Sequence, residues 1–286
     1  MIDISFLDQL DRFNLIIQKR VTSSYSGERK SIIAGHGTVL KDYRQYVRGD
    51  DVRAIDWKIF ARTDKLHIKQ YEEEKNLTAH IVVDSSASMN FGEKITKFDY
   101  ASMLGIGFAY LAMKQNEKFE FSTFSDSLNP VRAKRGSKHF ASLVNYLSTL
   151  QIKGKTNFTD VMTKYKKLIK TRSLIVIVSD FLFDIEIIKH ALYRLSNNEV
   201  IVIQVLDKAE KDLAITGSVR LHDSESNSVL KTFISQRLRN KYHERLEEHI
   251  IDLQKTCDQV NARFYSFTTN TSIFDAFYHV FKDKLY

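Results

Sequence analysis

The sequence predicts an α/β protein in which a doubly wound, mostly parallel sheet carries helices on both faces. From Leu77 onward, short apolar runs of strand length alternate with segments of helical periodicity, which is typical of a parallel sheet covered on both sides. The only proline is Pro130, and no linker-like stretch interrupts the pattern. We therefore expect a main domain over residues 76–286. Residues 1–75 are expected to form an N-terminal helical and β segment packed on that domain.

The N-terminal segment is predicted to open with an amphipathic helix at Phe6–Arg20, where apolar residues at 6, 7, 10, 13, 16 and 17 follow one helical stripe. A polar, glycine-containing stretch comes next. A short helix is then predicted around Val52–Ile59, with Asp51 or the aspartate before it as the N-cap. Trp57 lies in this helix and is expected in the core. Leu66–Tyr71 alternates apolar and polar residues, which predicts a strand.

The main domain is predicted to alternate buried strands and helices. Strands are expected at Leu77–Val83, Phe119–Phe124, Leu174–Val178, Val200–Leu206 and Ala262–Phe267, with a short edge strand near Asn129–Arg132. Helices are expected at Phe98–Met113, His139–Leu150, Phe158–Lys170 and Ile185–Leu195. An insertion at about residues 207–260 precedes the last strand and contains a charged amphipathic helix with apolar positions 234, 238, 242, 246, 250, 253 and 257.

Positive charge is concentrated in one part of the chain. The formal net charge is +8, and residues 131–172 contain 11 lysine and arginine residues against one acidic residue, Asp160. Part of this basic segment is expected to be an ordinary solvated helix face. It could also steer an acidic protein partner, or bind the phosphates of a nucleic acid.

Oxygen-bearing side chains lie in three loops next to predicted strands or helices. Asp84, Ser86 and Ser88 form a D-x-S-x-S pattern after the first buried strand, Thr156 precedes a helix, and Asp180 follows a third apolar strand. Loops at the carboxyl ends of parallel strands converge on ligands in open α/β sheets. Two carboxylates and three hydroxyls are hard ligands that suit Mg²⁺ or Mn²⁺. The sequence predicts a divalent-metal site here; the competing interpretations are a capping turn or a degraded copy of such a site.

The pattern of these five residues resembles the metal-ion-dependent adhesion site of a von Willebrand factor A domain. A block between Arg44 and Arg62, together with later marks, resembles the signature of the bacterial family of domain of unknown function 58. The residues of the upstream signature are Gly35-His36-Gly37, Tyr43-Arg44-Gln45-Tyr46, Gly49-Asp50-Asp51, Arg53, Ile55-Asp56-Trp57, Ala61-Arg62 and Tyr71-Glu72-Glu73-Glu74. The later residues are Ser179-Asp180-Phe181, Leu206-Asp207 and Asp223-Ser224-Glu225.

The resemblance implies a von Willebrand factor A-like main domain that acts as a non-enzymatic, metal-dependent protein-interaction module. It also implies a cytoplasmic partner of a MoxR-type AAA+ ATPase, in a chaperone-like or complex-maturation system. The Arg44-to-Arg62 block has a second interpretation, in which its arginine and aspartate pairs only fasten the N-terminal segment to the sheet.

Enzymatic motifs in this chain are incomplete. Gly154-Lys155-Thr156 resembles the end of a phosphate-binding loop, but the first glycine of that motif falls on Thr149. No Gly-x-Ser-x-Gly elbow surrounds the serines, and His243 and His249 lack the spacing of a zinc site. We therefore expect no enzyme. Nucleic-acid binding through residues 131–172 is the alternative function, and a phosphohydrolase would need a second metal site and a base.

The sequence favours a cytoplasmic location. The N terminus lacks the basic and then apolar plan of a secretory signal, and the single cysteine, Cys257, excludes an intramolecular disulfide. Tyr100–Met113, the longest uncharged run, is shorter than the roughly 20 apolar residues of a membrane span.

Overall fold

The computed structural model describes residues 6, 9–11, 39–72, 78–213, 217–222 and 229–282. The chain divides into two compact units, one of Met1–Val21 with Leu77–Tyr286 and one of Thr22–Asn76. Each unit is described by itself below. Of the helix predicted at Phe6–Arg20, Phe6 and residues 9–11 are helical, and the remainder lies outside the described residues.

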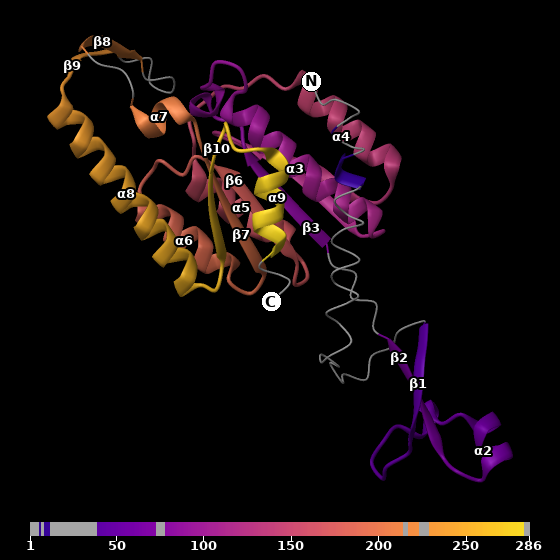
Figure 1. The fold of residues 1–286 in the computed structure, drawn as a ribbon. Helices are drawn as coiled ribbons and strands as arrows, with labels where there is room; N and C mark the ends of the chain where they lie inside the picture. Colours follow the sequence, from indigo (N-terminus) through magenta and orange to yellow (C-terminus); the bar gives the residue numbers. More distant parts are fainter. Residues whose placement is uncertain are drawn as a thin grey trace. The chain divides into compact units, whose positions relative to one another are not determined.

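The larger unit is built on a six-stranded sheet (Figure 1). Its strands lie in the order β10-β7-β6-β3-β4-β5, and neighbours are parallel except for the antiparallel edge pair β4 and β5. The α/β class and the predicted strands are confirmed. The strands are β3 (Thr78–Asp84), β4 (Lys118–Phe124), β5 (Leu128–Lys134), β6 (Leu174–Ser179), β7 (Glu199–Leu206) and β10 (Arg263–Thr268).

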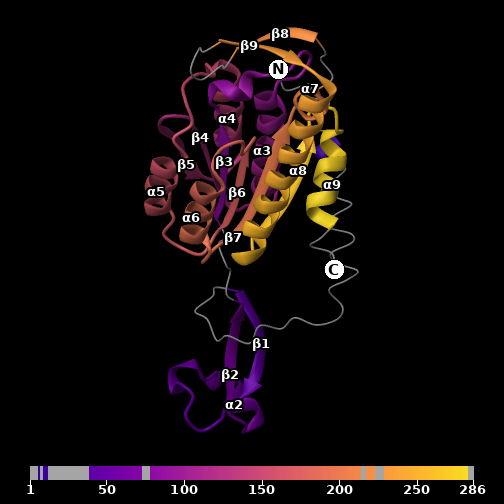
Figure 2. The ribbon, with the colours of Figure 1, turned by 90° about the vertical axis from the view of Figure 1, so that its left-hand side faces the viewer.

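Helices cover both faces of this sheet (Figures 1 and 2). One core cluster joins the sheet to α3 (Lys97–Lys114), α4 (Ser137–Thr149) and α9 (Ile273–Lys282). The other joins it to α5 (Phe158–Leu168), α6 (Ile185–Leu195) and α8 (Gln236–Gln259). Along β6, residues 176 and 178 belong to the first cluster and residues 175 and 177 to the second, as the two-residue period of a strand requires.

Helix α3 lies very close to the sheet. Thr96 and Asp99 form a capping box at its start, and a Cβ atom added at Gly105 would lie 2.7 Å from the Phe121 ring of β4. Glycine at this position therefore lets the helix backbone approach the strands. The close approach sets the position of Lys97, the first residue of the helix.

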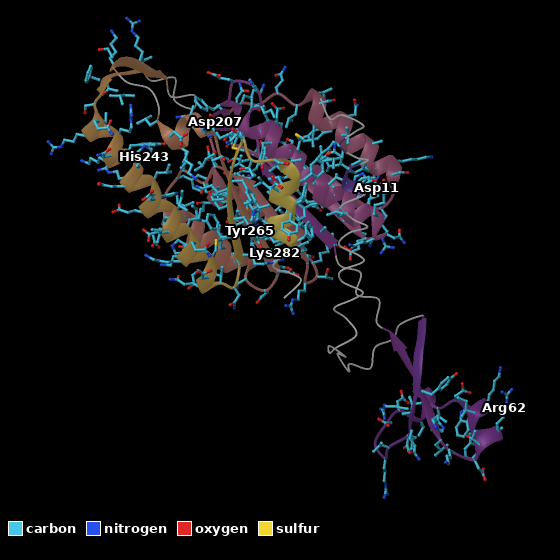
Figure 3. All side chains as sticks on the ribbon, viewed as in Figure 1. Asp11, Arg62, Asp207, His243, Tyr265 and Lys282 are labelled. Carbon is cyan, nitrogen blue, oxygen red and sulfur yellow. The ribbon has the colours of Figure 1, made fainter. Side chains whose placement is uncertain are left out.

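The N-terminal residues that the structure describes belong to this unit. Phe6 and Leu10 are buried in the cluster with α3 and α9, and the rings of Phe6 and Phe274 lie 5.8 Å apart. Asp11, labelled in Figure 3, pairs with Lys114 of α3 at 2.9 Å. The boundary between the units thus differs from the one drawn from the sequence, because Phe6 and Leu10 belong to the core of the larger unit.

The insertion between β7 and β10 holds more structure than the predicted helix. It contains α7 (Lys208–Asp212) and an antiparallel hairpin of β8 (Gly217–His222) and β9 (Val229–Ile234) before α8 begins. Helix α9 also had no sequence-based prediction. Its apolar residues 273, 274, 277, 280 and 281 follow one helical stripe, and Phe277 of that stripe packs on α3.

The smaller unit is an antiparallel hairpin of β1 (Val39–Gln45) and β2 (His67–Glu72) with a short helical connection. The predicted helix is divided into η1 (Val52–Ala54) and α2 (Trp57–Thr63), which Asp51 and Asp56 cap. The placement of Trp57 in the core was wrong, since its side chain is 61% exposed. Ile55 and Ile68 supply the buried apolar contacts of this small unit instead.

Candidate metal site at the ends of β3 and β6

The two predicted carboxylates lie where the strand order of the sheet reverses. The chain passes from β3 to β4 on one side, and later places β6 on the other side of β3. Ligands of open α/β sheets bind in the crevice that such a reversal creates at the carboxyl ends of the strands. Asp84 is the last residue of β3, and Asp180 directly follows β6. The sheet topology therefore brings both to this crevice.

The D-x-S-x-S segment forms a tight turn around the buried Asp84 carboxylate. One oxygen of Asp84 accepts a hydrogen bond from the Ser86 backbone N–H at 2.9 Å, and the other accepts from the Ser179 hydroxyl at 2.6 Å. The Ser86 and Ser88 hydroxyl oxygens lie 3.1 Å apart. The turn leads into the short helix η2 (Ala87–Asn90). A carboxylate and two hydroxyls are thus gathered within five residues of chain.

The negative charge of Asp84 is costly at this position. Burial, and after it the nearby charge of Asp180, raise the pKa of Asp84 to about 7, against the hydrogen bonds from Ser179 and Ser86. Desolvation and a like charge both disfavour the ionised form of a carboxyl group. A cation bound beside Asp84 would remove this penalty, and metal binding at such a site is expected to release a proton.

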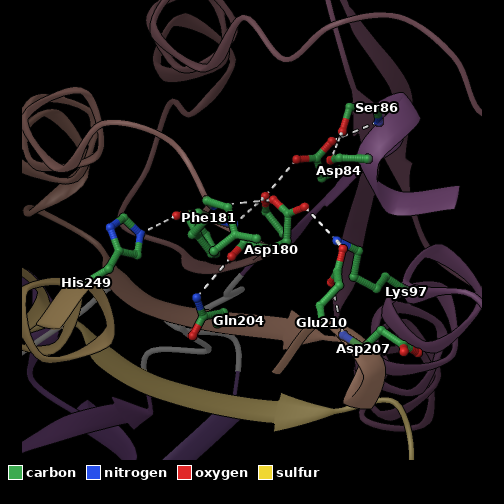
Figure 4. A network of polar contacts seen from close by, with 12 residues as sticks. Asp84, Ser86, Lys97, Asp180, Phe181, Gln204, Asp207, Glu210 and His249 are labelled. Carbon is green, nitrogen blue, oxygen red and sulfur yellow. Dashed lines mark hydrogen bonds and ion pairs between the residues drawn. The ribbon is translucent and has the colours of Figure 1, made fainter. Parts of the chain in front are cut away.

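Asp180 is already paired with a buried lysine. The Lys97 ammonium donates to Asp180 Oδ2 at 2.9 Å and to Glu210 Oε1 at 2.9 Å (Figure 4). The side chains of Lys97 and Asp180 are only 1% and 5% exposed. The Asp180 backbone carbonyl accepts from Gln204 Nε2 at 3.0 Å. Asp180 is therefore held from both its side chain and its main chain.

Lys97 remains charged in this environment. Burial alone would lower the pKa of Lys97, but the carboxylates of Asp180 and Glu210 outweigh that effect and leave the pKa above its usual value. Burial raises the pKa of Glu210 despite the neighbouring ammonium. The result is a fixed positive charge next to Asp180, on a helix end whose dipole would otherwise repel it.

The loop that carries Thr156 lies beside the Asp84 turn. The Ala87 N–H donates to the Gly154 carbonyl at 3.0 Å, and the Asn157 N–H donates to the Ser125 carbonyl at 2.9 Å. Gly154 has φ +95°, a left-handed conformation that side chains disfavour. These contacts place all three predicted loops at one end of the sheet. The direct contacts run through Asp84, Ser86 and Ser88, while Asp180 acts on Asp84 through its charge.

The side chains at this end of the sheet fit a hard divalent cation. Mg²⁺ and Mn²⁺ take carboxylate, hydroxyl and water oxygens, and Mg²⁺ usually keeps several waters. Within the described ranges, no group of three or more His, Cys, Asp or Glu side chains could hold a metal ion. The predicted set has only two such residues and relies on hydroxyls, so it is of a different kind. Both Asp84 oxygens accept hydrogen bonds and one Asp180 oxygen pairs with Lys97, so the two aspartates would supply negative charge beside the ion. Ser86, Ser88 and Thr156 would then bind it directly or through water.

Sequence reasoning missed Lys97 and Glu210. A signal for each was present. Lys97 follows the Thr96 N-cap of α3, where a basic residue opposes the helix dipole. Glu210 is the third residue of α7 and forms a capping box with Asp207. The Glu210 carboxylate accepts a hydrogen bond from the Asp207 N–H at 3.3 Å. Neither signal indicates that the two side chains share one buried position with Asp180.

A surface cavity of about 680 Å³ opens at the neighbouring strand ends, beside Asp207, Tyr100 and Ile273. None of the five predicted metal-site residues lines it. The cavity is therefore separate from the Asp84 turn, although Asp207 connects the two through Glu210.

The basic segment lies on the surface. All 11 of its lysine and arginine side chains are exposed, and they are distributed over β5, α4, α5 and the loops around them. Residues 153 and 155 belong to the loop that carries Thr156. Positive charge therefore lies close to the candidate site in the chain.

The family profile described as "Protein of unknown function DUF58" matches residues 42–251. The chain belongs to the DUF58 family. Its relatives include the uncharacterized protein Rv1480 of Mycobacterium tuberculosis, 26% identical over 268 residues, covering 91% of this chain and 84% of Rv1480. The uncharacterized protein YeaD of Bacillus subtilis is 23% identical over 137 residues, covering 48% of this chain and 33% of YeaD.

Solved structures also resemble the DUF58 chain. A conserved hypothetical protein BatB from Bacteroides thetaiotaomicron matches at 12% identity with a TM-score of 0.41, covering 73% of this chain and 98% of BatB. An aerotolerance-related membrane protein from Bacteroides fragilis matches at 15% identity with a TM-score of 0.45, covering 72% and 99%. In this chain, none of the helices that the structure describes combines the length and apolar character of a membrane span.

Proposed function

We propose that this DUF58 protein is a non-enzymatic protein-interaction module of the von Willebrand factor A type, which captures its partner through a divalent metal ion. Mg²⁺ or Mn²⁺ would be held by Asp84, Ser86, Ser88, Thr156 and Asp180. The observation that carries this proposal is the convergence of Asp84 and Asp180 at the reversal of strand order, with two serine hydroxyls 3.1 Å apart beside them.

The arrangement favours binding over nucleophilic catalysis. The Asp84 oxygens accept from the Ser86 backbone N–H and from the Ser179 hydroxyl, so this carboxylate orients the turn. Serine nucleophiles need an adjacent general base. Hydroxyl and carboxylate oxygens around a common point instead match the ligand preference of Mg²⁺.

A protein carboxylate is the group that would complete the metal's coordination. The Lys97 ammonium offsets part of the negative charge of Asp180 and Glu210, so the protein supplies limited negative charge to a dication. The exposed basic segment, residues 131–172, would attract an acidic partner to this end of the sheet. We propose a MoxR-type AAA+ ATPase, or a protein on which it acts, as that partner in a chaperone-like or complex-maturation system.

Metal titration tests the site. The wild-type protein is expected to bind Mn²⁺ in calorimetry, and Asp84→Asn is expected to abolish binding, since the amide keeps the size of the side chain but loses its charge. Ser86→Ala is expected to weaken binding by about tenfold or more through the loss of one ligand. The control Asp212→Asn changes an exposed carboxylate and should bind as the wild type does. Equal Mn²⁺ binding by wild type and Asp84→Asn would rule out this site.

Co-purification tests the partner. A MoxR-type ATPase encoded in the same genome is expected to be retained by the wild-type protein in Mg²⁺, and to be released by EDTA. Retention should fail with Asp84→Asn and persist with Asp212→Asn. Retention that is insensitive to EDTA would show an interaction independent of the metal.

Nucleic-acid binding is the second candidate, because all 11 basic side chains of residues 131–172 are exposed. It predicts affinity for duplex DNA or RNA that falls steeply with salt and does not respond to EDTA. No retention on duplex at low salt would eliminate it.

A further inference from the structure

Lys97 occupies a position where a lysine is normally unfavourable. It is the first residue of α3, directly after the Thr96 N-cap, and its side chain is 1% exposed. Both the helix dipole and burial oppose an ammonium there. Two carboxylates, from the end of β6 and from α7, make 2.9 Å contacts that compensate for this cost. This ion pair lies at the edge of the candidate metal site, so we expect it to affect metal binding there.

The consequence follows from which oxygen Lys97 holds. Asp180 Oδ2 is engaged by the ammonium, and Asp180 Oδ1 has a long 3.4 Å contact from the Leu182 N–H. A dication beside Asp84 must therefore share Asp180 with a fixed positive charge. Like charges a few ångströms apart in a partly desolvated site repel each other appreciably. The ammonium thus weakens metal binding and keeps Asp180 from full coordination.

We propose that Lys97 sets the divalent-cation affinity of the Asp84 site, by holding Asp180 as an ion-paired, outer carboxylate. This inference rests on the proposed function. It adds that the site binds its dication weakly. Because Asp180 does not fully neutralise the ion, a carboxylate of the partner can still bind to it. Lys97 is a positioning residue, acting on the metal through Asp180, and Glu210 holds it in place.

The test compares Mn²⁺ affinity in the wild type, Lys97→Met and the double variant Lys97→Met/Glu210→Gln. The double variant also neutralises Glu210, which would otherwise lose its partner, and glutamine can still complete the capping box of α7. Both variants are expected to bind Mn²⁺ about tenfold or more tightly than the wild type, because the repelling charge is gone. Lys94→Met, which changes an exposed lysine three residues earlier, should leave the affinity unchanged.

The direction of the change separates this role from a purely structural one. If Lys97 only braced the fold, its loss would loosen the site and lower Mn²⁺ affinity. Equal or weaker binding by the double variant, with wild-type binding intact, would overturn the inference and leave the proposed function standing. Binding by the variant alone would support the inference and refute metal dependence in the wild type. No binding by either protein would refute both.

Thermal melting covers the case of a poorly folded variant. Mn²⁺ is expected to raise the Tm of the double variant by more than it raises the Tm of the wild type, because the dication replaces the missing positive charge. A double variant that stays unfolded in saturating Mn²⁺ would count against the inference.

Discussion

Two polar clusters on the same face of β3 differ in how they compensate for burial. His80, in the middle of the strand, lies 3.0 Å from the Tyr165 hydroxyl of α5 and 3.6 Å from Glu120 of β4. Asp84, four residues later at the strand end, lies beside Asp180 and within a network that includes Lys97 and Glu210. The first cluster joins side chains of packed secondary structure. The second joins side chains from loop junctions and helix starts.

The difference shows what the end of a parallel strand can do that its middle cannot. The His80 and Tyr165 side chains satisfy each other, with their rings edge to face at 5.7 Å. Burial raises the pKa of Tyr165 well above its usual value, so the phenol stays neutral. At the Asp84 end, charged groups remain and are balanced across separate loops. A cluster balanced in this way can respond to an added cation. The His80 cluster instead rests on the contact between His80 and Tyr165, and it leaves Glu120 Oε1 buried without a hydrogen-bond partner.

The largest effect is expected from removing the ammonium at the strand end. Lys97→Met leaves the buried carboxylates of Asp180 and Glu210 unpaired, which should lower the free energy of unfolding by about 3–5 kcal/mol in EDTA. Urea denaturation measures this. Lys255→Met removes a similar ion pair, with Asp252 at 3.1 Å, but on an exposed surface where the loss should be below about 1 kcal/mol. Similar losses for the two variants would show that burial does not distinguish them.

The pH dependence of stability should reveal the raised pKa of Asp84. The folded-state pKa of Asp84 is raised to about 7, so the folded protein retains a proton that the unfolded chain releases near pH 4. In EDTA, the contribution of Asp84 to stability is therefore present below about pH 4 and is lost as the pH rises to about 7. The loss is at most about 1.4 kcal/mol per pH unit.

Urea denaturation between pH 4 and 7 tests this prediction. The wild-type protein should become less stable relative to Asp84→Asn as the pH rises, since asparagine does not titrate. A constant difference between the two proteins across this range would contradict the raised pKa.

The smallest effect is expected in the middle of the strand. Tyr165→Phe removes the hydroxyl that contacts His80 and should cost about 1–2 kcal/mol, because one buried polar atom of His80 loses its partner. Mn²⁺ affinity should be unchanged, since Tyr165 is not in contact with the Asp84 turn. A large shift in Mn²⁺ affinity would show that the two clusters are coupled along β3.

Much of the central fold could be predicted from local patterns. The apolar runs at β3, β6 and β7 are buried on both faces, and their residue type and length are enough to identify them. Two of the elements that were missed differ in this respect. Strand β1 lies in a polar stretch without a clear period, whereas the apolar stripe of α9 at 273, 277 and 280 is a local signal for a helix. The exposure of Trp57 was also missed, because residue type alone does not show how small the surrounding core is.

The sequence alone indicates the candidate oxygen ligands, which stay a prediction, but it does not indicate the charge balance around them. Asp84, Ser86, Ser88, Thr156 and Asp180 are each recognisable from their position after a strand or before a helix, which is local information. The sequence by itself thus determined the strands of the central sheet, most of the helices that cover them and the candidate residues at the strand ends. Only the tertiary structure decided that Lys97 meets Asp180 and Glu210, which lie 83 and 113 positions away in the chain. The physical reason is that these contacts depend on the order of the strands in the sheet and on the close approach of α3 to the sheet. The local periodicity of apolar residues contains neither kind of information.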